Sequence, residues 1–467
     1  MLHSGKAYQI RQISNDRAII DDGQTCYLLH SPTLRIFRID DRTRDIIETG
    51  AALKAQYTAA QREETLARLD LSGLFKGEDA KILSEKNHEY YYAEPSVKSL
   101  MLNVSLLCNL KCSYCFNDQT SPQKRIETPL MTAEVALKAV DLYLEDEGSE
   151  NSQESIDFFG GEPLINFDVI REVILYAAGK TKNRKRRLSF NITTNGVLLT
   201  EEKYEFLKKY NTRFHLSLDG DEEIHDKNRR TKDGNGTYRR IINNLKNCIS
   251  ERPELFSAHA TITPSCLDLV RIDNHFDSLG LENYGFELMY CGCKSSAKPW
   301  NKTLVEEYDR CYGIYGKKLL EYILSGEKKR RSLTSILKRL RRIAKRDLTY
   351  IPCRMAREAY TIAPDGYVYP CHWLVENKNF RMGSVYRGID QSRRKKFYPK
   401  LVFEKEICKS CWARYLCGGG CPAVSMVNNG NDTYPDKWVC KDRLTMWKWM
   451  VWLYLKLNEQ NAAKKLL

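Results

Sequence analysis

The stretch from residue 99 to residue 116 reads SLMLNVSLLCNLKCSYCF, and the interpretation of the whole chain begins there. Its apolar first half predicts a buried strand, and three cysteines follow directly at Cys108, Cys112 and Cys115. Three thiolates can hold three irons of a cubane cluster and leave the fourth iron without a protein ligand. A zinc site is the alternative, but it needs a fourth ligand, and the next histidine is His215. The spacing therefore favours an open iron–sulfur site at which a small molecule can react.

The composition describes a globular protein of two or three domains. The chain has 467 residues, 42% of them hydrophobic and 29% charged. Residues 1–40 lack a long apolar run behind a basic start, so no signal peptide is expected. We therefore expect a cytoplasmic location, where the 16 cysteines act as metal ligands rather than disulfides. The apolar stretch 447–457 contains two lysines, which favours a docked helix over any membrane association.

The net charge of +14 is concentrated in three short runs of the chain. Such runs are usually solvated helix faces, and the alternative is attraction for an acidic peptide or another polyanion. The runs are residues 182–187, 328–346 and 393–396. In the second run basic and apolar residues alternate with helical spacing, which predicts an ordinary amphipathic helix.

Short apolar runs alternate with helical patterns from Ser99 onward. Six strand-helix alternations predict parallel β/α units, whose chemistry collects on the loops after the strands. The predicted strands are 100–106, 155–159, 188–193, 214–218, 259–263 and 284–289, and the clearest predicted helices are 133–147, 169–180 and 201–210.

Polar and glycine-rich motifs stand where four of these strands end. The cysteine triad follows the first strand, and Gly160-Gly161-Glu162-Pro163 follows the second. Thr194-Asn195-Gly196 follows the third, and Ser217-Leu218-Asp219-Gly220 closes the fourth. Each motif alone is a common turn signal. Their order along the chain, each at a strand end, indicates a single site.

This combination, with aromatic Tyr114 and Phe116 beside the last cysteine, resembles the radical S-adenosylmethionine (SAM) enzymes. The resemblance implies an α/β fold with a partial (β/α)6 TIM-like barrel. It also implies that a [4Fe–4S] cluster on Cys108, Cys112 and Cys115 binds SAM and cleaves it to a 5′-deoxyadenosyl radical, which abstracts a hydrogen atom from the substrate. The residues that the resemblance assigns to SAM at the amine are Gly160, Gly161 and Glu162. At the ribose and carboxylate they are Ser217, a guanidinium from the segment 225–230, for which we choose Arg230 over Arg229, and, less strongly, Asn195.

A second set of seven cysteines lies near the C-terminus. Its middle block reads C-x2-C-x5-C-x3-C, and the series resembles the SPASM extension of radical SAM enzymes. A zinc ribbon is the alternative, but it needs two C-x2-C pairs, and this region has one. The resemblance implies two auxiliary [4Fe–4S] clusters, and therefore three clusters in the whole chain.

The family pattern divides these cysteines into two groups. We call the nearer group the near site and the other the distal site; the near site comprises Cys353, Cys371 and Cys421, and the distal site Cys408, Cys411, Cys417 and Cys440. Two fully ligated cubane clusters need eight thiolates, and this region supplies seven, so the near site lacks one ligand. Either an iron stays open there, or a remote cysteine such as Cys291 or Cys293 completes the site.

Residues 1–95 follow a different pattern, with four short predicted strands before three short helices. The strands are 7–13, 17–21, 24–29 and 34–39, and the helices are 41–48, 51–56 and 59–70. The order resembles a winged helix-turn-helix. Ahead of such an enzyme core, it is similar to the leader-recognition domain of peptide-maturing enzymes, which captures a leader peptide as an added strand. DNA binding is the alternative, and we favour the peptide.

The expected domain plan has five parts. It assigns residues 1–95 to a winged-helix-like leader-recognition domain, 96–310 to the barrel, 311–350 to basic bridging helices, 351–445 to the SPASM domain and 446–467 to a C-terminal helix.

The whole chain most resembles maturases of ribosomally made peptides of the ranthipeptide type, such as PapB and the SCIFF maturases. The resemblance implies a thioether between a cysteine sulfur and a side-chain carbon, often of an acidic residue. The partners implied are a precursor peptide and a reductant such as flavodoxin or ferredoxin, with no nucleic acid.

Three rival functions stay open from the residues alone. A sactipeptide maturase would link the cysteine to an α-carbon. A sulfatase-type maturase would make formylglycine, but the added N-terminal domain and Phe159 before the Gly-Gly-Glu run disfavour it. A DNA-binding iron–sulfur regulator would leave the open cysteine triad unexplained.

Overall fold

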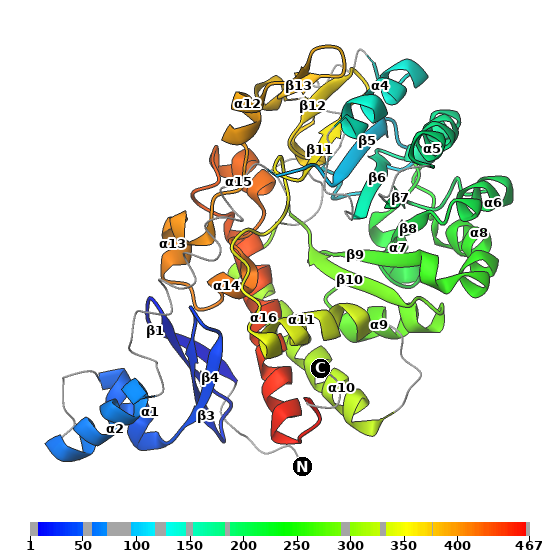
Figure 1. Cartoon of the computed structure of the whole chain (residues 1–467). Helices are drawn as coiled ribbons and strands as arrows, with labels where there is room; N and C mark the ends of the chain where they lie inside the picture. The colour runs from blue at the N-terminus through cyan, green and yellow to red at the C-terminus, as the bar shows by residue number, and fades with distance from the viewer. Residues whose placement is uncertain are drawn as a thin grey trace.

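The computed structural model describes residues 8–49, 58–71, 95–116, 128–145, 153–182, 187–290, 299–326, 333–375 and 377–463. Within these ranges the chain forms an N-terminal antiparallel sheet, a curved parallel sheet with helices outside it, and a C-terminal part that covers the inner side of the curve (Figure 1).

The curved sheet contains the six predicted parallel strands in sequence order. Neighbouring strands pair in parallel from β5 through β10. They are β5 (Ser99–Ser105), β6 (Gln153–Gly160), β7 (Arg187–Thr194), β8 (Arg213–Ser217), β9 (Phe256–Ile262) and β10 (Asn283–Leu288). Strands β5 and β10 do not pair with each other, so the sheet is an open, partial barrel and confirms the expected α/β fold class.

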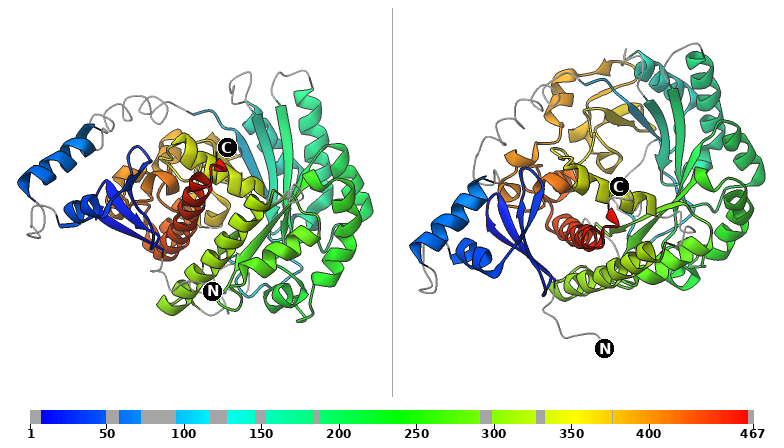
Figure 2. Two further views of the ribbon diagram at one scale, coloured as in Figure 1. Left: turned by 90° about the horizontal axis from the view of Figure 1, so that it is seen from below. Right: turned by 60° about the horizontal axis from the view of Figure 1, so that its bottom comes forward.

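Helices connect these strands and cover the outer face of the sheet (Figure 2). They are α4 (Ala133–Leu144), α5 (Phe167–Thr181), α6 (Glu201–Lys209), α7 (Glu222–Asn228), α8 (Tyr238–Glu251) and α9 (Leu269–Ser278). Side-chain caps begin several of them: the hydroxyl of Thr132 accepts a hydrogen bond from Val135 N, and the carboxylate of Asp221 accepts one from Ile224 N. The three helices predicted between these strands are present.

The C-terminal part continues the same sheet and then returns along one long helix. Strand β11 (Ala359–Ile362) pairs in parallel with β5, and β12 (Tyr367–Tyr369), β13 (Gly383–Ser384) and β14 (Gly388–Ile389) extend the sheet in antiparallel fashion. The helices are α10 (Lys302–Ser325), α11 (Thr334–Lys345), α12 (Gln391–Lys396), α13 (Glu406–Lys409), α14 (Arg414–Cys417), α15 (Pro422–Asn429) and α16 (Lys437–Glu459).

Two of the predicted domain boundaries fall inside continuous helices. The boundary at residue 310 lies within α10, and that at residue 445 lies within α16. Both helices pack against each other, and α11 packs against α16 as well. The barrel, the bridging helices and the C-terminal helix are therefore tied together by shared helices rather than separated by linkers.

The N-terminal module has the four predicted strands, β1 (Gln9–Ser14), β2 (Arg17–Asp21), β3 (Cys26–His30) and β4 (Arg35–Ile39), followed by α1 (Asp41–Thr49) and α2 (Ala59–Leu71). The strands form one antiparallel sheet in the order β1-β2-β3-β4, so β1 and β4 are its edges. The predicted helix at 51–56 lies outside the described residues.

The N-terminal sheet lies beside α16 and the loop that carries the distal-site cysteines (Figure 1). The Tyr8 hydroxyl donates to Lys448 O at 3.1 Å, and Lys456 Nζ donates to Asp22 at 2.7 Å. The buried Ser31 hydroxyl donates to Trp412 O at 3.0 Å, one residue after Cys411. The N-terminal sheet therefore supports one wall of the distal site.

The part of the chain that the structure describes contains no helix with both the length and the apolar character needed to cross a membrane.

Replacing Arg414 should loosen the contact between the N-terminal sheet and the distal-site loop. Arg414 is buried and donates to Asn15 O at 2.7 Å and to Asp16. We expect Arg414→Met to lower the free energy of unfolding by about 2 kcal/mol, because charged hydrogen bonds are lost, and to speed amide exchange in β1 and β2. The control is Arg11→Met, whose exposed pair with Glu48 is worth less than about 1 kcal/mol. Unchanged exchange in β1 and β2 of Arg414→Met would contradict the proposed support.

Candidate active site

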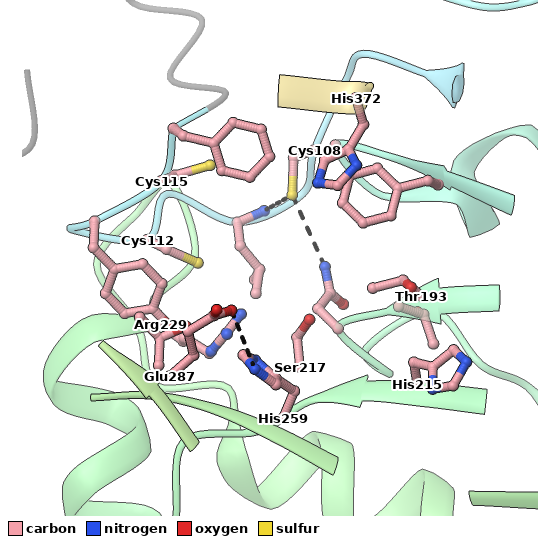
Figure 3. Close-up of a pocket in the computed structure, with 18 of the residues that line it drawn as sticks. Cys108, Cys112, Cys115, Thr193, His215, Ser217, Arg229, His259, Glu287 and His372 are labelled. Atoms are coloured by element: carbon pink, nitrogen blue, oxygen red, sulfur yellow. Dashed lines mark hydrogen bonds and ion pairs between the residues drawn. The ribbon is translucent and has the colours of Figure 1, made fainter. Parts of the chain in front are cut away.

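The cysteine triad lies on a compact loop directly after β5. Cys115 N donates to Cys112 O at 3.2 Å, which closes a turn, and Leu110 N donates to the sulfur of Cys108 at 3.4 Å. Lys111 N donates to Arg230 O at 2.8 Å and joins the loop to the segment after α7. The three thiols come from this one loop and lie at one side of a cavity, as Figure 3 shows.

Burial sets the protonation of these thiols. It raises the pKa of Cys108 to about 11 and that of Cys112 to about 12; Cys115 adds to both rises, and Cys108 adds to that of Cys112. Only thiolates bind metal, so a cluster would displace these protons and neutralise the resulting negative charge. Three thiols of one loop that line the same cavity fit the three protein-bound irons of an open cubane.

A buried ion pair lies beside the cysteine triad. Arg229 Nε lies 3.1 Å from the Asp219 carboxylate, and the Tyr114 hydroxyl donates to the same carboxylate. The Arg229 guanidinium also lies over the Tyr114 ring at 5.2 Å. Burial alone would lower the pKa of Arg229, but Asp219, Tyr114 and Cys112 raise it, so the group stays cationic beside the thiols. The cation favours the thiolate form that a cluster requires.

The Gly160-Gly161 turn lies against the backbone that leads into the triad. A Cβ on Gly160, which has φ +142°, would stand 2.0 Å from Ser105 O, and one on Gly161 would stand 2.4 Å from Leu107 O. Both glycines line the cavity. They are therefore needed for this close approach, and their position agrees with the SAM contact that the resemblance implied.

The structure gives Glu162 a different task from the one expected. Its fully buried carboxylate accepts hydrogen bonds from Leu164 N at 3.0 Å, Thr194 Oγ1 at 2.7 Å and Asn195 N at 2.8 Å. Burial raises its pKa, and these three hydrogen bonds oppose the rise. Because Glu162 does not line the cavity, its carboxylate joins the loops after β6 and β7 rather than facing a ligand as a countercharge.

The cavity has a volume of about 410 Å³ and opens at the carboxyl ends of the parallel strands. Ser217 and Asn195 line it as expected, and Asn195 Nδ2 lies 3.9 Å from the sulfur of Cys108. Arg230 does not line it. Its exposed guanidinium donates to Asp226 O at 2.7 Å and to Gly234 O at 3.2 Å. The expected role of Arg230 is therefore corrected: Arg229 is the neighbouring arginine that reaches the cavity.

Across the cavity from the triad stands a charged group from β9 and β10 (Figure 3). The Glu287 carboxylate lies 3.6 Å from His259 Nε2 and accepts a hydrogen bond from Arg443 at 2.8 Å. Tyr290 follows on the same strand end, and its hydroxyl donates to buried Asp442 at 2.7 Å. Both Arg443 and Asp442 come from α16, so this wall joins the barrel to the C-terminal part.

Aromatic rings separate the triad from the near site. Phe116 stacks on Trp373 with ring centroids 3.9 Å apart, and Phe159 lies 4.4 Å from the ring of His372. Burial lowers the pKa of His372 to about 4, so the ring is neutral at physiological pH. Because His372 follows Cys371 directly in sequence, the same short segment forms part of both sites.

The cysteines of the second set have their principal neighbouring charges within the two groups that the resemblance implied. Burial raises the pKa of Cys353 to about 12, and the neighbouring charge that contributes most is Cys421, which also acts on Cys371. Burial likewise raises the pKa of Cys408 and Cys440 to about 12, and their principal neighbours are the other cysteines of the distal site. These cysteines therefore lie near other members of their own group. Cys291 and Cys293, the remote candidates for the near site, lie outside the described residues.

A second cavity, of about 880 Å³, lies beside the near site. Its lining includes all three near-site cysteines and basic side chains from α11 and α16, namely Lys338, Arg339, Arg342 and Arg443. Glu287, Tyr290, His372 and Trp373 line both cavities. The triad cavity and the near-site cavity are thus two compartments on either side of one shared wall.

Sequence reasoning did not find this shared wall. His372 and Trp373 were not considered, although their place beside Cys371 was a signal. The Asp219–Arg229 pair was also missed, although Asp219 stands in the turn after β8 and Arg229 in the segment from which a SAM-binding guanidinium was expected. Glu287 lies in the last predicted strand and Tyr290 directly after it, but their partners come from α16, far away in sequence.

The buried His225 should make the protein less stable in acid. Thr237 Oγ1 donates to Arg229 O, so it accepts from His225 Nε2–H, while His225 Nδ1 accepts from Asp219 N. Burial lowers the pKa of His225 from 6.5 to about 4. The folded state thus resists protonation, and the resulting stability is complete above pH 6.5 and is lost as the pH falls towards 4.

We expect the free energy of unfolding to fall by about 2 kcal/mol between pH 7 and pH 5 through this group alone. Urea unfolding of the wild type and of His225→Gln at both pH values measures it as the difference between their pH slopes. Equal slopes in the two proteins would mean that His225 is not buried in its neutral form.

Comparison with known proteins agrees with this arrangement. The model of the Radical SAM superfamily matches residues 102–262, which include the triad and strands β5 to β9. The SPASM iron–sulfur cluster-binding domain matches residues 353–412, which include Cys353, Cys371, Cys408 and Cys411. The Radical SAM domain implies a [4Fe–4S] cluster and SAM, and the SPASM domain implies auxiliary iron–sulfur clusters.

Several curated relatives are named as enzymes. The radical SAM cyclopropyl synthase TigE of Paramaledivibacter caminithermalis is 35% identical over 159 residues, which are 32% of this chain and 32% of TigE. A cysteine-type anaerobic sulfatase-maturating enzyme of Clostridium novyi is 32% identical over 152 residues, 32% of this chain and 40% of that one. The chain thus spans less than half the length of these two relatives. The corresponding enzyme of Clostridium perfringens is 24% identical over 363 residues, 70% of this chain and 89% of the relative.

Solved structures share the fold. The structure described as native anSMEcpe with bound AdoMet superposes with a TM-score of 0.61 at 21% identity, and covers 78% of this chain and 99% of that one. The structure of Streptococcus suis SuiB bound to precursor peptide SuiA superposes with a TM-score of 0.51 at 14% identity. The match covers 92% of this chain and 100% of the SuiB chain. With the matched domains and the geometry of the triad, these findings identify the chain as a radical SAM enzyme with a SPASM domain.

Proposed function

We propose that this enzyme forms thioether crosslinks in a ribosomally made precursor peptide, between a cysteine sulfur and a side-chain carbon. The observation that carries the proposal is the shared wall of Glu287, Tyr290, His372 and Trp373. A peptide that lies across this wall can present one residue to the triad cavity and another to the near site. Crosslinking needs these two positions, because the carbon and the sulfur must be activated separately and then meet.

The near site suits a substrate thiolate. Three cysteines of the described chain meet there, one fewer than a fully ligated cubane needs, and they line an 880 Å³ cavity large enough for several residues of a peptide. When bound, the SAM-binding cluster supplies the radical that removes a hydrogen atom from the substrate, and the near site would hold the sulfur that attacks the resulting carbon centre. The chain's own part is to position the peptide and exclude water.

The charges of the near-site cavity favour an acidic peptide segment. Lys338, Arg339 and Arg342 of α11 line one side, and Arg354 and Arg443 also line the cavity. Cationic side chains in a recessed site attract carboxylates and orient them. This agrees with crosslinks to side chains of acidic residues, which the sequence resemblance suggested.

The N-terminal module is assigned to leader capture. Its sheet has edges at β1 and β4, and an extended peptide could add to either edge as a further strand. Hydrogen bonds and ion pairs fasten the module to α16 and to the distal-site loop. A leader held there would stay at a constant distance from the two cavities.

Relatives of this chain support a peptide or protein substrate without deciding the product. Solved structures of the same fold include SuiB bound to precursor peptide SuiA and anSMEcpe bound to AdoMet and a peptide. Formylglycine formation is the second candidate function, because one of the sulfatase-maturating relatives aligns over 70% of this chain.

The product is decided by mass spectrometry after anaerobic reaction with SAM, a reductant and the cysteine-containing peptide encoded beside the gene. We expect a loss of two hydrogens per crosslink and cysteines that resist alkylation. Fragmentation separates a side-chain linkage from an α-carbon linkage. A loss of two hydrogens with cysteines that still alkylate indicates ring formation between carbons, and loss of the sulfur indicates formylglycine; either result would rule out the proposed product.

Removal of one triad thiol should abolish SAM cleavage. Cys108→Ala leaves two ligands for the SAM-binding cluster, so we expect no 5′-deoxyadenosine by chromatography and about one third less iron per chain. Cys248→Ala is the control, because Cys248 is buried on α8 away from both cavities. Cleavage that persists in Cys108→Ala would refute the role of the triad.

Neutralising the basic face of α11 should weaken peptide binding. We expect Lys338→Gln with Arg342→Gln to raise the Kd of an acidic core peptide about tenfold at low salt, measured by fluorescence anisotropy, and to reduce its salt dependence. Arg341→Gln with Lys345→Gln is the matched control, since these exposed residues of the same helix lie outside the cavity. An equal rise in Kd in both double variants would mean that the net charge of the protein, and not the cavity, attracts the peptide.

A further inference from the structure

A separate cavity of about 340 Å³ lies where the N-terminal sheet meets the ends of α11 and α16. We call it the β4 cavity. Among the described residues, it shares no lining residue with the triad cavity or the near-site cavity. Its lining includes Ile36 and Arg38 of β4, Ile343 and Arg346 at the end of α11, and Tyr454 and Glu459 of α16.

The β4 cavity presents two cations that no carboxylate balances. Arg38 and Arg346 are exposed, and in the described ranges neither guanidinium has an ion-pair partner. The carboxylate of the lining, Glu459, is already engaged, because it accepts hydrogen bonds from the Tyr27 hydroxyl and, at 3.0 Å, from Lys456 Nζ. The unbalanced charge at the cavity is therefore positive and attracts a carboxylate.

Arg346 stands at a position that usually belongs to glycine. It ends α11 with φ +55°, in the left-handed region where a side chain costs energy. Its N–H donates to Ile343 O at 3.1 Å, which closes the last turn. Leu34, which also lines the β4 cavity, has φ +51°. Strained backbone of this kind collects at binding sites, so it adds to the charge as a sign of a ligand.

Of the two edges of the N-terminal sheet, β4 is the better template for an added strand. Arg35–Ile39 pairs in unbroken register with β3, and within the described residues the other side of β4 pairs with no strand. On β1, the pairing is irregular between Gln12 and Ser14, and the Gln12 amide donates to Arg17 O at 3.2 Å. An irregular edge twists away and disfavours pairing with another chain.

The lining of the β4 cavity indicates the chemistry of such a strand. Ile36 and Arg38, two residues apart on β4, both line the cavity, so an added strand would place alternate side chains over it. Ile36 and Ile343 suit an apolar side chain, and Arg38 and Arg346 suit a carboxylate. The occupant that fits is an extended peptide with an apolar and an acidic side chain two residues apart.

Helix α11 joins the β4 cavity to the near-site cavity. Lys338 and Arg342 line the near-site cavity, and Arg346 lines the β4 cavity. These residues are spaced by four, about one turn, so their cations follow the helix from one cavity to the other. From Lys338 to Arg346 the distance along the helix is about 12 Å, which an extended peptide covers in about four residues.

We infer that the β4 cavity anchors an acidic leader segment as an added strand, and that the basic residues of α11 direct the following residues into the near-site cavity. The inference rests on the proposed function in taking a precursor peptide as the substrate, but not on which bond is formed. It assigns leader capture to one edge of the sheet and gives the charge of α11 a task outside the near site.

The anchor is tested by fluorescence anisotropy with the full chain and the labelled N-terminal half of the precursor peptide encoded beside the gene. Arg38→Gln with Arg346→Gln should raise its Kd about tenfold at low salt. The matched control, Arg11→Gln with Lys345→Gln, removes the same charge from β1 and from α11 outside the β4 cavity. An unchanged Kd in the first double variant, or an equal rise in both, would overturn the anchor.

Hydrogen exchange of the wild type with and without this peptide locates the added strand. We expect slower exchange of the amides of Arg35–Ile39 and unchanged exchange in Gln9–Ser14. Protection of β1, or of α1 and α2, in place of β4 would overturn the inference.

The path along α11 is tested by photo-crosslinking. A benzophenone placed in the full precursor between its N-terminal half and its first cysteine should attach to Thr334–Lys345 on irradiation. Attachment only to other segments would contradict the path.

None of these measurements uses the reaction product, so the inference and the proposed function can fail separately. Protection of β4 together with a product other than a thioether would keep the anchor and reject the proposed product. Thioether formation with the leader bound elsewhere would keep the product and reject the anchor.

Discussion

Burial of the cysteine thiols is the constraint on which the rest of this structure depends. Desolvation raises the pKa values of Cys108, Cys112, Cys353, Cys408 and Cys440 to about 11 or 12, so these groups are poor ligands until iron displaces their protons. The surrounding chain compensates with fixed charges. Arg229 stands beside the triad and Lys405 beside the distal site, each held by a buried carboxylate. Both arrangements favour thiolates without giving solvent access to the sulfur.

The same need for enclosure explains why the C-terminal part covers the inner side of the barrel. The parallel strands alone would leave the triad cavity open at their carboxyl ends. The wall formed by Glu287, Tyr290, His372 and Trp373 divides this space into two compartments and depends on side chains of α16 for its hydrogen bonds. Because α16 also contacts the N-terminal sheet, the N-terminal module, the near-site cavity and the barrel are connected through one helix.

The strands and part of the cavity lining could be predicted from the sequence. Parallel strands buried on both faces appear as apolar runs, and their loops must meet at one end of the sheet, so Gly160, Gly161, Asn195 and Ser217 were placed correctly at the cavity. The sequence could not show whether Arg229 or Arg230 reaches the cavity, because the side chains of adjacent residues after a short helix can point in opposite directions. The task of Glu162 was also hidden, since its three hydrogen-bond donors become partners only after β6 and β7 have paired.

The sequence by itself determined the chemistry of this protein: an open cysteine triad after the first strand, seven further cysteines, and a barrel that gathers its motifs at one edge. These are properties of local spacing and of strand order, and both can be read along the chain. Only the tertiary structure decided which charges accompany the sulfurs and which side chains separate the two cavities. Asp219 and Arg229, Lys405 and Asp432, and Glu287 and Arg443 are joined by contacts between distant segments. Their electrostatic effect depends on distance and burial, which no sequence pattern specifies.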